Sequence, residues 1–189
     1  MWTLIPTISN ENLPLDTIEA LAWGSNLEWG YDKHPPFSAF AVEIFYRIFG
    51  NQDWAYYLLS QLFVVASFIA VFKLSEEFFN NKIFALISVF LIEGIYFYNF
   101  TSPEFNVNIS QLPFWAFSLF FSWRCIKFNN LIDFIILGIF LGLGFLSKYL
   151  FSYLIIGIFF LFFYLYSKEK KINLLNIFAS SFVFLLILT

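Results

Sequence analysis

From residue 54 to the C-terminus, apolar residues fall in long runs that short polar breaks separate. The clearest runs cover residues 54–72, 83–100, 131–147, 150–166 and 172–189. Each run is close to the roughly 20 residues that an α-helix needs to cross a bilayer. The pattern therefore predicts an all-α chain built around membrane-spanning helices.

Two further features complete the predicted bundle. Residues 104–123, EFNVNISQLPFWAFSLFFSW, form another crossing if their polar start lies at the membrane interface. The apolar stretch from residue 131 to 166 is too long for one helix, and Ser147-Lys148 is the polar break in its middle. We therefore expect a tight hairpin there, and about six crossings in total.

Composition assigns this pattern to a polytopic membrane protein. Of the 189 residues, 60% are hydrophobic and 12% are charged. Soluble domains average about 45–50% apolar and about 25% charged residues. The net charge of −3 gives no basic excess that would indicate a nucleic-acid partner. The single cysteine, Cys125, excludes an internal disulfide.

Basic residues are distributed unevenly between the two sides of the predicted bundle. With alternating crossings, one side carries Lys73, Lys82, Arg124, Lys127, Lys168, Lys170 and Lys171. The other side carries Lys33, Arg47 and Lys148. Because cytoplasmic loops are enriched in Lys and Arg, we expect the first side to be cytoplasmic. Residues 1–53 then form a loop with juxtamembrane helices on the outer face, beside a bundle over residues 54–189.

The outer loop contains an acidic pair with two interpretations. Asp16-Thr-Ile-Glu19 has the spacing of a capping box, in which Asp16 begins a helix and Glu19 returns a hydrogen bond. The two carboxylates also share a helix face at i, i+3. A carboxylate at the membrane surface can serve as a general base. The spacing leaves both interpretations open.

The segment Lys33-His34-Pro35-Pro36 predicts an extended residue followed by a helix. Pro35 restricts His34 to an extended conformation, and Pro36 suits the first turn of a helix that runs to about Phe49. Cationic side chains beside the positive end of a helix form an anion site. An exposed turn with a snorkelling lysine is the alternative.

Two smaller patterns concern packing and solvation. Gly138-xxx-Gly142, with Gly144 nearby, predicts a close contact between helices. Glu93 and Asp133 lie at the ends of predicted spans, where we expect water to solvate them.

Four segments together resemble the bacterial family 39 glycosyltransferases, which are integral-membrane enzymes of the GT-C class. They are LPLDTIEALAWG, WGYDKHPPFSAF, EFNVNISQLPFW and GLGFLSKY, in this order. The similarity runs from about Pro6 to Phe163. The family includes protein O-mannosyltransferases and sugar transferases of lipid A and lipopolysaccharide. The resemblance implies a GT-C-type helical bundle.

The resemblance also implies roles for the acidic pair. Asp16 matches the aspartate of the first outer loop, which is catalytic in the family, and Glu19 is its nearby acidic partner. Many relatives have glutamate directly after the aspartate, whereas Thr17 follows Asp16 here.

Other matching positions correspond to binding residues. Lys33, His34 and Lys148 correspond to contacts with the phosphate of the donor. The positions in the second outer loop correspond to substrate-binding groups: Glu104, Asn106 and Asn108. No residue is assigned as a metal ligand, and the use of a divalent metal is left open.

The implied reaction moves a sugar from a polyprenyl-phosphate donor to an acceptor hydroxyl of a glycolipid or protein. It takes place on the periplasmic face of the bacterial inner membrane. Family members have crossings before and after the segment seen here, so the resemblance implies either a fragment of a split enzyme, whose partner is the remainder, or a truncated product. The alternatives are an inactive remnant, an accessory membrane subunit or a transporter. A transporter needs ionisable groups in mid-bilayer.

Overall fold

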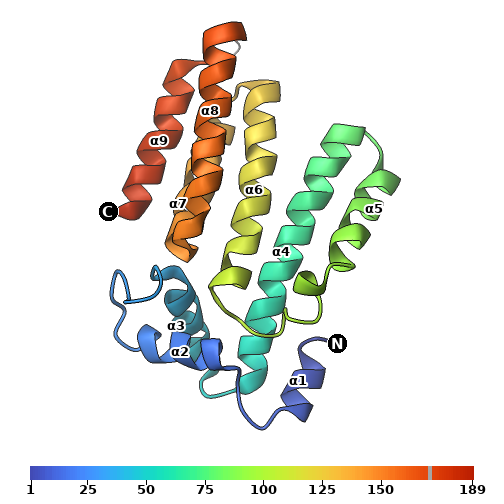
Figure 1. Cartoon of the computed structure of the whole chain (residues 1–189), viewed down its shortest axis with the longest axis vertical. Helices are drawn as coiled ribbons and strands as arrows, with labels where there is room; N and C mark the ends of the chain where they lie inside the picture. The colour runs from blue at the N-terminus through green and yellow to red at the C-terminus, as the bar shows by residue number, and fades with distance from the viewer. Residues whose placement is uncertain (170–171) are drawn as a thin grey trace.

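The computed structural model describes residues 1–169 and 172–189, and its regular elements are all helices. Three short helices gather at one end of the molecule (Figure 1): α1 (Leu4–Ser9), α2 (Leu15–Gly24) and α3 (Phe37–Phe49). The helices that extend from this end are α4 (Asp53–Phe79), α5 (Lys82–Glu93), α6 (Val107–Phe128), α7 (Leu131–Ser147), α8 (Ser152–Glu169) and α9 (Leu174–Leu188). The all-α prediction is confirmed.

Most predicted spans correspond to helices whose ends differ slightly. Helix α7 has the predicted bounds, and α4 continues past residue 72 to Phe79. The break at Ser147-Lys148 is confirmed as the corner between α7 and α8, with the 3₁₀ turn η2 (Tyr149–Phe151) leading into α8. Two segments are long and apolar enough to cross a membrane, namely Asp53–Phe79 and Tyr149–Lys168. Helices α7 and α9 are apolar but shorter.

The helix expected over residues 83–100 is shorter than predicted, and the expectation is wrong for residues 94–100. Helix α5 ends at Glu93, where Gly94 follows and Asn99 Nδ2 donates to the carbonyl of Glu93 at 2.7 Å. The chain then turns through the 3₁₀ helix η1 (Tyr96–Tyr98). Twelve residues of α-helix rise only about 18 Å. That length is less than the roughly 30 Å thickness of a hydrocarbon core.

Small residues allow close contact between α7 and α9. A Cβ atom added at Gly142 would lie 2.8 Å from the side chain of Ile187, and one added at Gly138 would clash with the Ser180 carbonyl. The close contact predicted from Gly138-xxx-Gly142 is confirmed. Gly144 instead makes room for the ring of Phe151.

Aromatic packing fixes α3 to the bundle. The ring of Phe37, in the first turn of α3, meets Phe114 edge-on at 5.0 Å between centroids and Phe63 at 6.0 Å. Edge-to-face pairs at such distances add about 0.5–1.5 kcal/mol each beyond the area they bury. The His34-Pro35-Pro36 segment, which precedes Phe37, is thereby held against the bundle.

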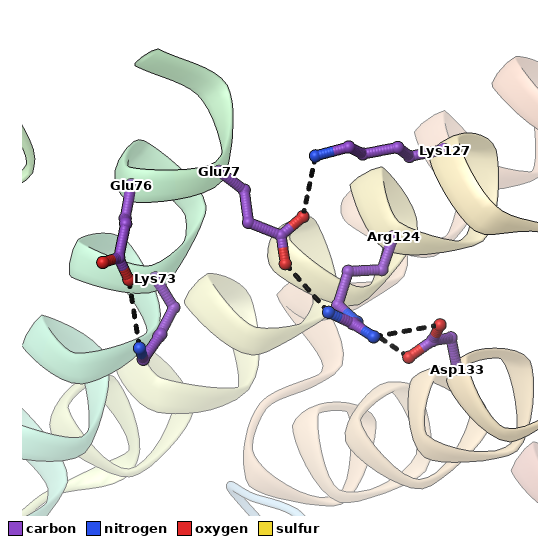
Figure 2. Close-up of polar contacts among 6 residues, drawn as sticks. All are labelled: Lys73, Glu76, Glu77, Arg124, Lys127 and Asp133. Atoms are coloured by element: carbon purple, nitrogen blue, oxygen red, sulfur yellow. Dashed lines mark hydrogen bonds and ion pairs between the residues drawn. The ribbon is translucent and has the colours of Figure 1, made fainter. Parts of the chain in front are cut away.

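Ion pairs close the end of the bundle away from α2 and α3 (Figure 2). Arg124 Nη1 lies 2.8 Å from Glu77 Oε1, and Arg124 Nε lies 2.8 Å from Asp133 Oδ1. Lys127 Nζ lies 3.6 Å from Glu77 Oε2. Asp133 is only 3% exposed, so the expectation that water solvates it is wrong. Its burial is possible because Arg124 supplies the opposite charge. Glu93 is exposed, as expected.

Candidate functional site

The candidate site lies where α2, α3 and the segment before α6 meet. Helix α2 begins at Leu15 with Pro14 as its N-cap, so Asp16 lies inside the helix. The capping-box interpretation is therefore wrong. The proline starts the helix with its fixed φ of −58°, and the Asp16 amide finds its partner in a distant part of the chain.

Residues 104 and 105 bond to the first turn of α2. The amide of Asp16 donates to Glu104 Oε1 at 3.3 Å, and Thr17 Oγ1 donates to the carbonyl of Phe105 at 3.1 Å. Thr17 and Phe105 are both buried. A carboxylate also suits the positive end of a helix. The second predicted loop thus fixes the first turn of α2, and with it the position of Asp16.

Helices α2 and α3 approach closely at Gly24. A Cβ atom there would lie 2.8 Å from the carbonyl oxygen of Ala39. The intervening loop folds back onto α2, because Tyr31 stacks on Trp23 at 5.2 Å and its hydroxyl donates to the Trp23 carbonyl at 2.8 Å. Trp23 also meets His34 edge-on at 5.9 Å. The loop therefore brings His34 beside α2.

Helix α3 confirms the prediction made from the paired prolines. Pro36 is its N-cap, and the helix runs from Phe37 to Phe49. Both prolines are among the fully buried residues, whereas His34 is half-buried.

These elements enclose a small pocket at the end of the bundle. It is lined by Asp16, Glu19, Ala20, Trp23, His34, Ser38, Asn106 and Val107. The structure therefore brings together Asp16, Glu19, His34 and Asn106 from three separate parts of the sequence. The free volume is about 10 Å³, which is room for about one water molecule. A sugar does not fit unless the surrounding segments move apart.

Lys33 lies outside the pocket lining and is held by Glu19. The distance between Lys33 Nζ and Glu19 Oε1 is 2.6 Å, with side-chain exposures of 62% and 29%. The hydrogen bond to Glu19, together with the negative charge of that carboxylate, raises the pKa of Lys33. Glu19 therefore acts as the counter-ion of Lys33 in this conformation.

Glu104 faces Asp16 from the second loop. Burial raises the pKa of the Glu104 carboxyl, and the nearby charge of Asp16 raises it further. The hydrogen bond from the Asp16 amide acts in the opposite direction. Glu104 is thus already committed to α2, rather than being a free group at the surface.

The two asparagines of the second loop organise the start of α6. Asn106 is the N-cap of α6, and its Oδ1 accepts from the amides of Asn108 at 2.9 Å and Ile109 at 3.1 Å. Lys148, the C-cap residue of α7, donates from Nζ to Asn108 Oδ1. Lys148 thereby reaches the first turn of α6, although it does not line the pocket that contains Asp16.

Sequence reasoning missed Trp23 and Ser38 as pocket residues. Trp23 could have been found from its spacing, because residues 16, 20 and 23 fall on one face of a helix. Ser38 is 1% exposed, and no sequence signal separates it from other small residues. Among residues 1–169 and 172–189, no group of three or more His, Cys, Asp or Glu side chains is placed to hold a metal ion.

Comparison with known proteins gives two similarities. A family model described as dolichyl-phosphate-mannose-protein mannosyltransferase matches residues 33–189. Undecaprenyl phosphate-alpha-4-amino-4-deoxy-L-arabinose arabinosyl transferase of Wigglesworthia glossinidia brevipalpis is 28% identical over 155 residues, which cover 78% of this chain. The matched region spans only 27% of the length of that relative. No solved structure matches the chain.

Proposed function

The chain belongs to the dolichyl-phosphate-mannose-protein mannosyltransferase family of membrane glycosyltransferases, and on this premise we propose that it takes part in sugar transfer from a polyprenyl-phosphate donor. The acceptor is a hydroxyl group of a glycolipid or protein. The observation that carries this proposal is the pocket where Asp16, Glu19, His34 and Asn106 meet at the end of an apolar bundle. The similar Wigglesworthia protein is named as an undecaprenyl phosphate-linked arabinosyl transferase, and this name supports a polyprenyl phosphate as the donor lipid.

In the proposed reaction, Asp16 is the general base. The acceptor oxygen attacks the anomeric carbon of the sugar, and the bond between that carbon and the phosphate oxygen breaks. The lipid phosphate leaves with the bonding electrons, and the carboxylate of Asp16 takes the proton of the acceptor hydroxyl. The exposed position of Asp16 at the rim of the pocket suits this role.

Lys33, His34 and Lys148 contact the phosphate in this proposal. Charge-assisted hydrogen bonds are about twice as strong as neutral ones, and they strengthen as charge develops on the leaving group. Lys33 exchanges its bond with Glu19 for a bond with the phosphate. Lys148 starts from its hydrogen bond with Asn108.

Residues of the second outer loop hold the elements that carry the proposed catalytic and phosphate-binding groups. Glu104 holds the first turn of α2, and Asn106 begins α6. Asn108 holds Lys148. We propose that these three residues contact the substrate, as the family resemblance implies, and that they also hold α2, α6 and Lys148 in position around it.

The remainder of the enzyme is a further partner in this proposal. The matched region covers 27% of the similar transferase, and additional segments would contribute contacts to the acceptor. An inactive remnant or accessory membrane subunit is the second candidate. The observation that favours it is the small volume of the pocket, about 10 Å³.

The base assignment is tested by Asp16→Asn in the active assembly that contains this chain. Turnover should fall by a factor of about 10² or more, the usual contribution of general-base catalysis. Binding of polyprenyl phosphate should not change. Asp32→Asn, which alters another exposed acid of the same loop, should leave turnover at the wild-type rate. Normal turnover of Asp16→Asn would show that Asp16 is not the general base, and it would favour the alternative that this chain is an inactive remnant.

The orientation in the bacterial inner membrane is part of the same proposal. The site end lies on the periplasmic side, and the end with Arg124 lies in the cytoplasm. A cysteine in place of Ser25, at the site end, should react with an impermeant thiol reagent in intact cells. A cysteine in place of Ser167, near the far end of α8, should react only after the membrane is opened. Both serines are exposed, and Cys125 is fully buried, so background labelling should be low.

A further inference from the structure

Two apolar cavities lie between the helices of the bundle. One has a volume of about 180 Å³ and is lined by side chains of α7, α8 and α9, including Leu137, Ile158 and Ile177. The other has a volume of about 380 Å³ and lies between α4, η1 and α6. Its volume is within the range of about 300–1,000 Å³ that is common for small-molecule sites.

The larger cavity begins where α5 ends. Its lining includes Ile92 near the end of α5, Phe97 and Tyr98 of η1, and Val71 of α4. If α5 had continued to residue 100 as a helix, the turn of η1 would not cover this space. The early end of α5 therefore creates the cavity.

The α6 wall of this cavity changes from polar to apolar along the helix. Asn108 and Gln111 lie near the start of α6, and the later lining residues are Leu112, Trp115, Ala116 and Leu119. Their spacing of three or four residues places them on one helix face. The cavity thus has a polar part beside the candidate site and an apolar part that extends into the bundle.

The polar part presents hydrogen-bond donors. Asn108 Oδ1 accepts from Lys148, and Gln111 Oε1 accepts from Trp115 Nε1 at 3.0 Å. When the oxygen of a carboxamide is used in this way, its NH₂ group is left to donate. Two amide groups therefore line one end of an apolar space, and the ammonium of Lys148 is hydrogen-bonded to one of them, Asn108, from outside the lining. This combination fits an anionic head group with a hydrocarbon chain.

We propose that this cavity, and not the one between α7, α8 and α9, takes the isoprenoid chain of a polyprenyl phosphate. The phosphate lies at Lys148 and Asn108, and the chain follows α6 past Leu112 and Ala116. This inference rests on the proposed function for the identity of the lipid. It adds which surface of the bundle the lipid occupies. The lining of the smaller cavity, among the residues that the structure describes, consists of apolar and hydroxyl-bearing side chains.

The test uses purified, detergent-solubilised protein titrated with farnesyl phosphate, farnesol and inorganic phosphate. Ala116→Phe fills the proposed cavity, and Ser181→Phe is the matched control because it adds the same ring to the smaller cavity. We expect Ala116→Phe to weaken farnesyl phosphate and farnesol binding at least tenfold while leaving inorganic phosphate binding at the wild-type value. Ser181→Phe should bind all three probes as the wild type does.

A second variant guards against misfolding caused by the added ring. Leu112→Ala removes a chain contact without overpacking, and it should weaken farnesyl phosphate binding severalfold without affecting inorganic phosphate. Wild-type affinity for farnesyl phosphate in both Ala116→Phe and Leu112→Ala would overturn the proposal. Weaker binding in Ser181→Phe alone would place the chain in the other cavity. If Lys148→Ala weakened binding in the same series while the cavity variants did not, the phosphate contact of the proposed function would stand and the inference would fail.

Discussion

The two ends of the bundle use charged side chains in different ways. At the end away from α2, the guanidinium of Arg124 bonds with both Glu77 and Asp133, from two other helices. At the site end, Lys33 has one carboxylate partner and 62% of its side chain is exposed. A guanidinium with two partners is committed to holding helices together, whereas an exposed ammonium exchanges its partner at little cost. Charge is structural at one end and available to a ligand at the other.

The largest effect on stability should come from the structural end. Arg124→Ala leaves Asp133, which is 3% exposed, without its counter-charge. Breaking a buried pair from one side costs about 3–5 kcal/mol, and denaturant titration in mixed micelles would measure the loss. Lys73→Ala is the control, because its pair with Glu76 is exposed at 54% on the lysine side and should cost at most about 1 kcal/mol. Equal losses of stability in the two variants would show that the Arg124 ion pairs stabilise the fold no more than an exposed surface pair does.

Substitutions of lysines at the site end should change the affinity for polyprenyl phosphate. Lys33→Ala and Lys148→Ala should each weaken polyprenyl phosphate binding about tenfold, because each variant removes a charge-assisted hydrogen bond to the phosphate. If both residues serve one phosphate, the loss in the double variant should differ from the sum of the two single losses. Lys127→Ala, at the structural end, should leave binding unchanged. Strictly additive losses would indicate that Lys33 and Lys148 do not share a ligand.

Local patterns predicted much of this architecture, and contacts distant in sequence account for the rest. The bounds of α7 and the start of α3 followed from apolar length and from the paired prolines, which act on their own neighbours. The capping of α2 could not be predicted, because Glu104 and Asp16 are separated by 88 positions. The end of α5 depends on a side chain, Asn99, that returns to the Glu93 carbonyl after a turn.

In the candidate site, too, local patterns predicted some features, and contacts between distant residues determine the others. The sequence placed Asp16 and His34 in one outer region, and the structure brings both to one pocket. The bond between Glu19 and Lys33 was not foreseen, because Glu19 lies on α2 and Lys33 lies in the loop that folds back onto this helix. Asp133 was expected in water because it lies at the end of a predicted span, and the pattern along the chain did not show that Arg124 of another helix pairs with it. In both cases the decisive information is which helix packs beside which.

Glu19→Gln should produce a smaller effect in the opposite direction. In this conformation the carboxylate of Glu19 competes with a phosphate for Lys33. Its removal should therefore strengthen polyprenyl phosphate binding, by at most about fivefold, because solvent weakens a pair of which the lysine is 62% exposed. Glu28→Gln, another exposed acid of the loop, should not change the affinity. Weaker binding or lost turnover in Glu19→Gln would instead support the catalytic role that the family resemblance implies.

The smallest effect concerns Glu104, the carboxylate that holds α2. Burial raises the pKa of Glu104 above its ordinary value of 4.5, so the folded chain binds this proton more tightly than the unfolded chain does. A raised pKa contributes stability that is fully present below the unfolded value and is lost as pH rises through the folded value. The ionised form present at pH 7 is therefore less favourable to folding than the protonated form at low pH.

Glu104→Gln should separate the charge of this residue from its hydrogen bond. Glutamine keeps an oxygen that can accept from the Asp16 amide and does not titrate in this range. The variant should unfold at the same or a slightly higher temperature than the wild type at pH 7, and the difference should disappear as pH falls below 4.5. Glu11→Gln, which alters an exposed acid outside the site, should match the wild type at both pH values. A lower unfolding temperature for Glu104→Gln at pH 7 would mean that the negative charge itself holds α2, and the site end would then also use charge for structure.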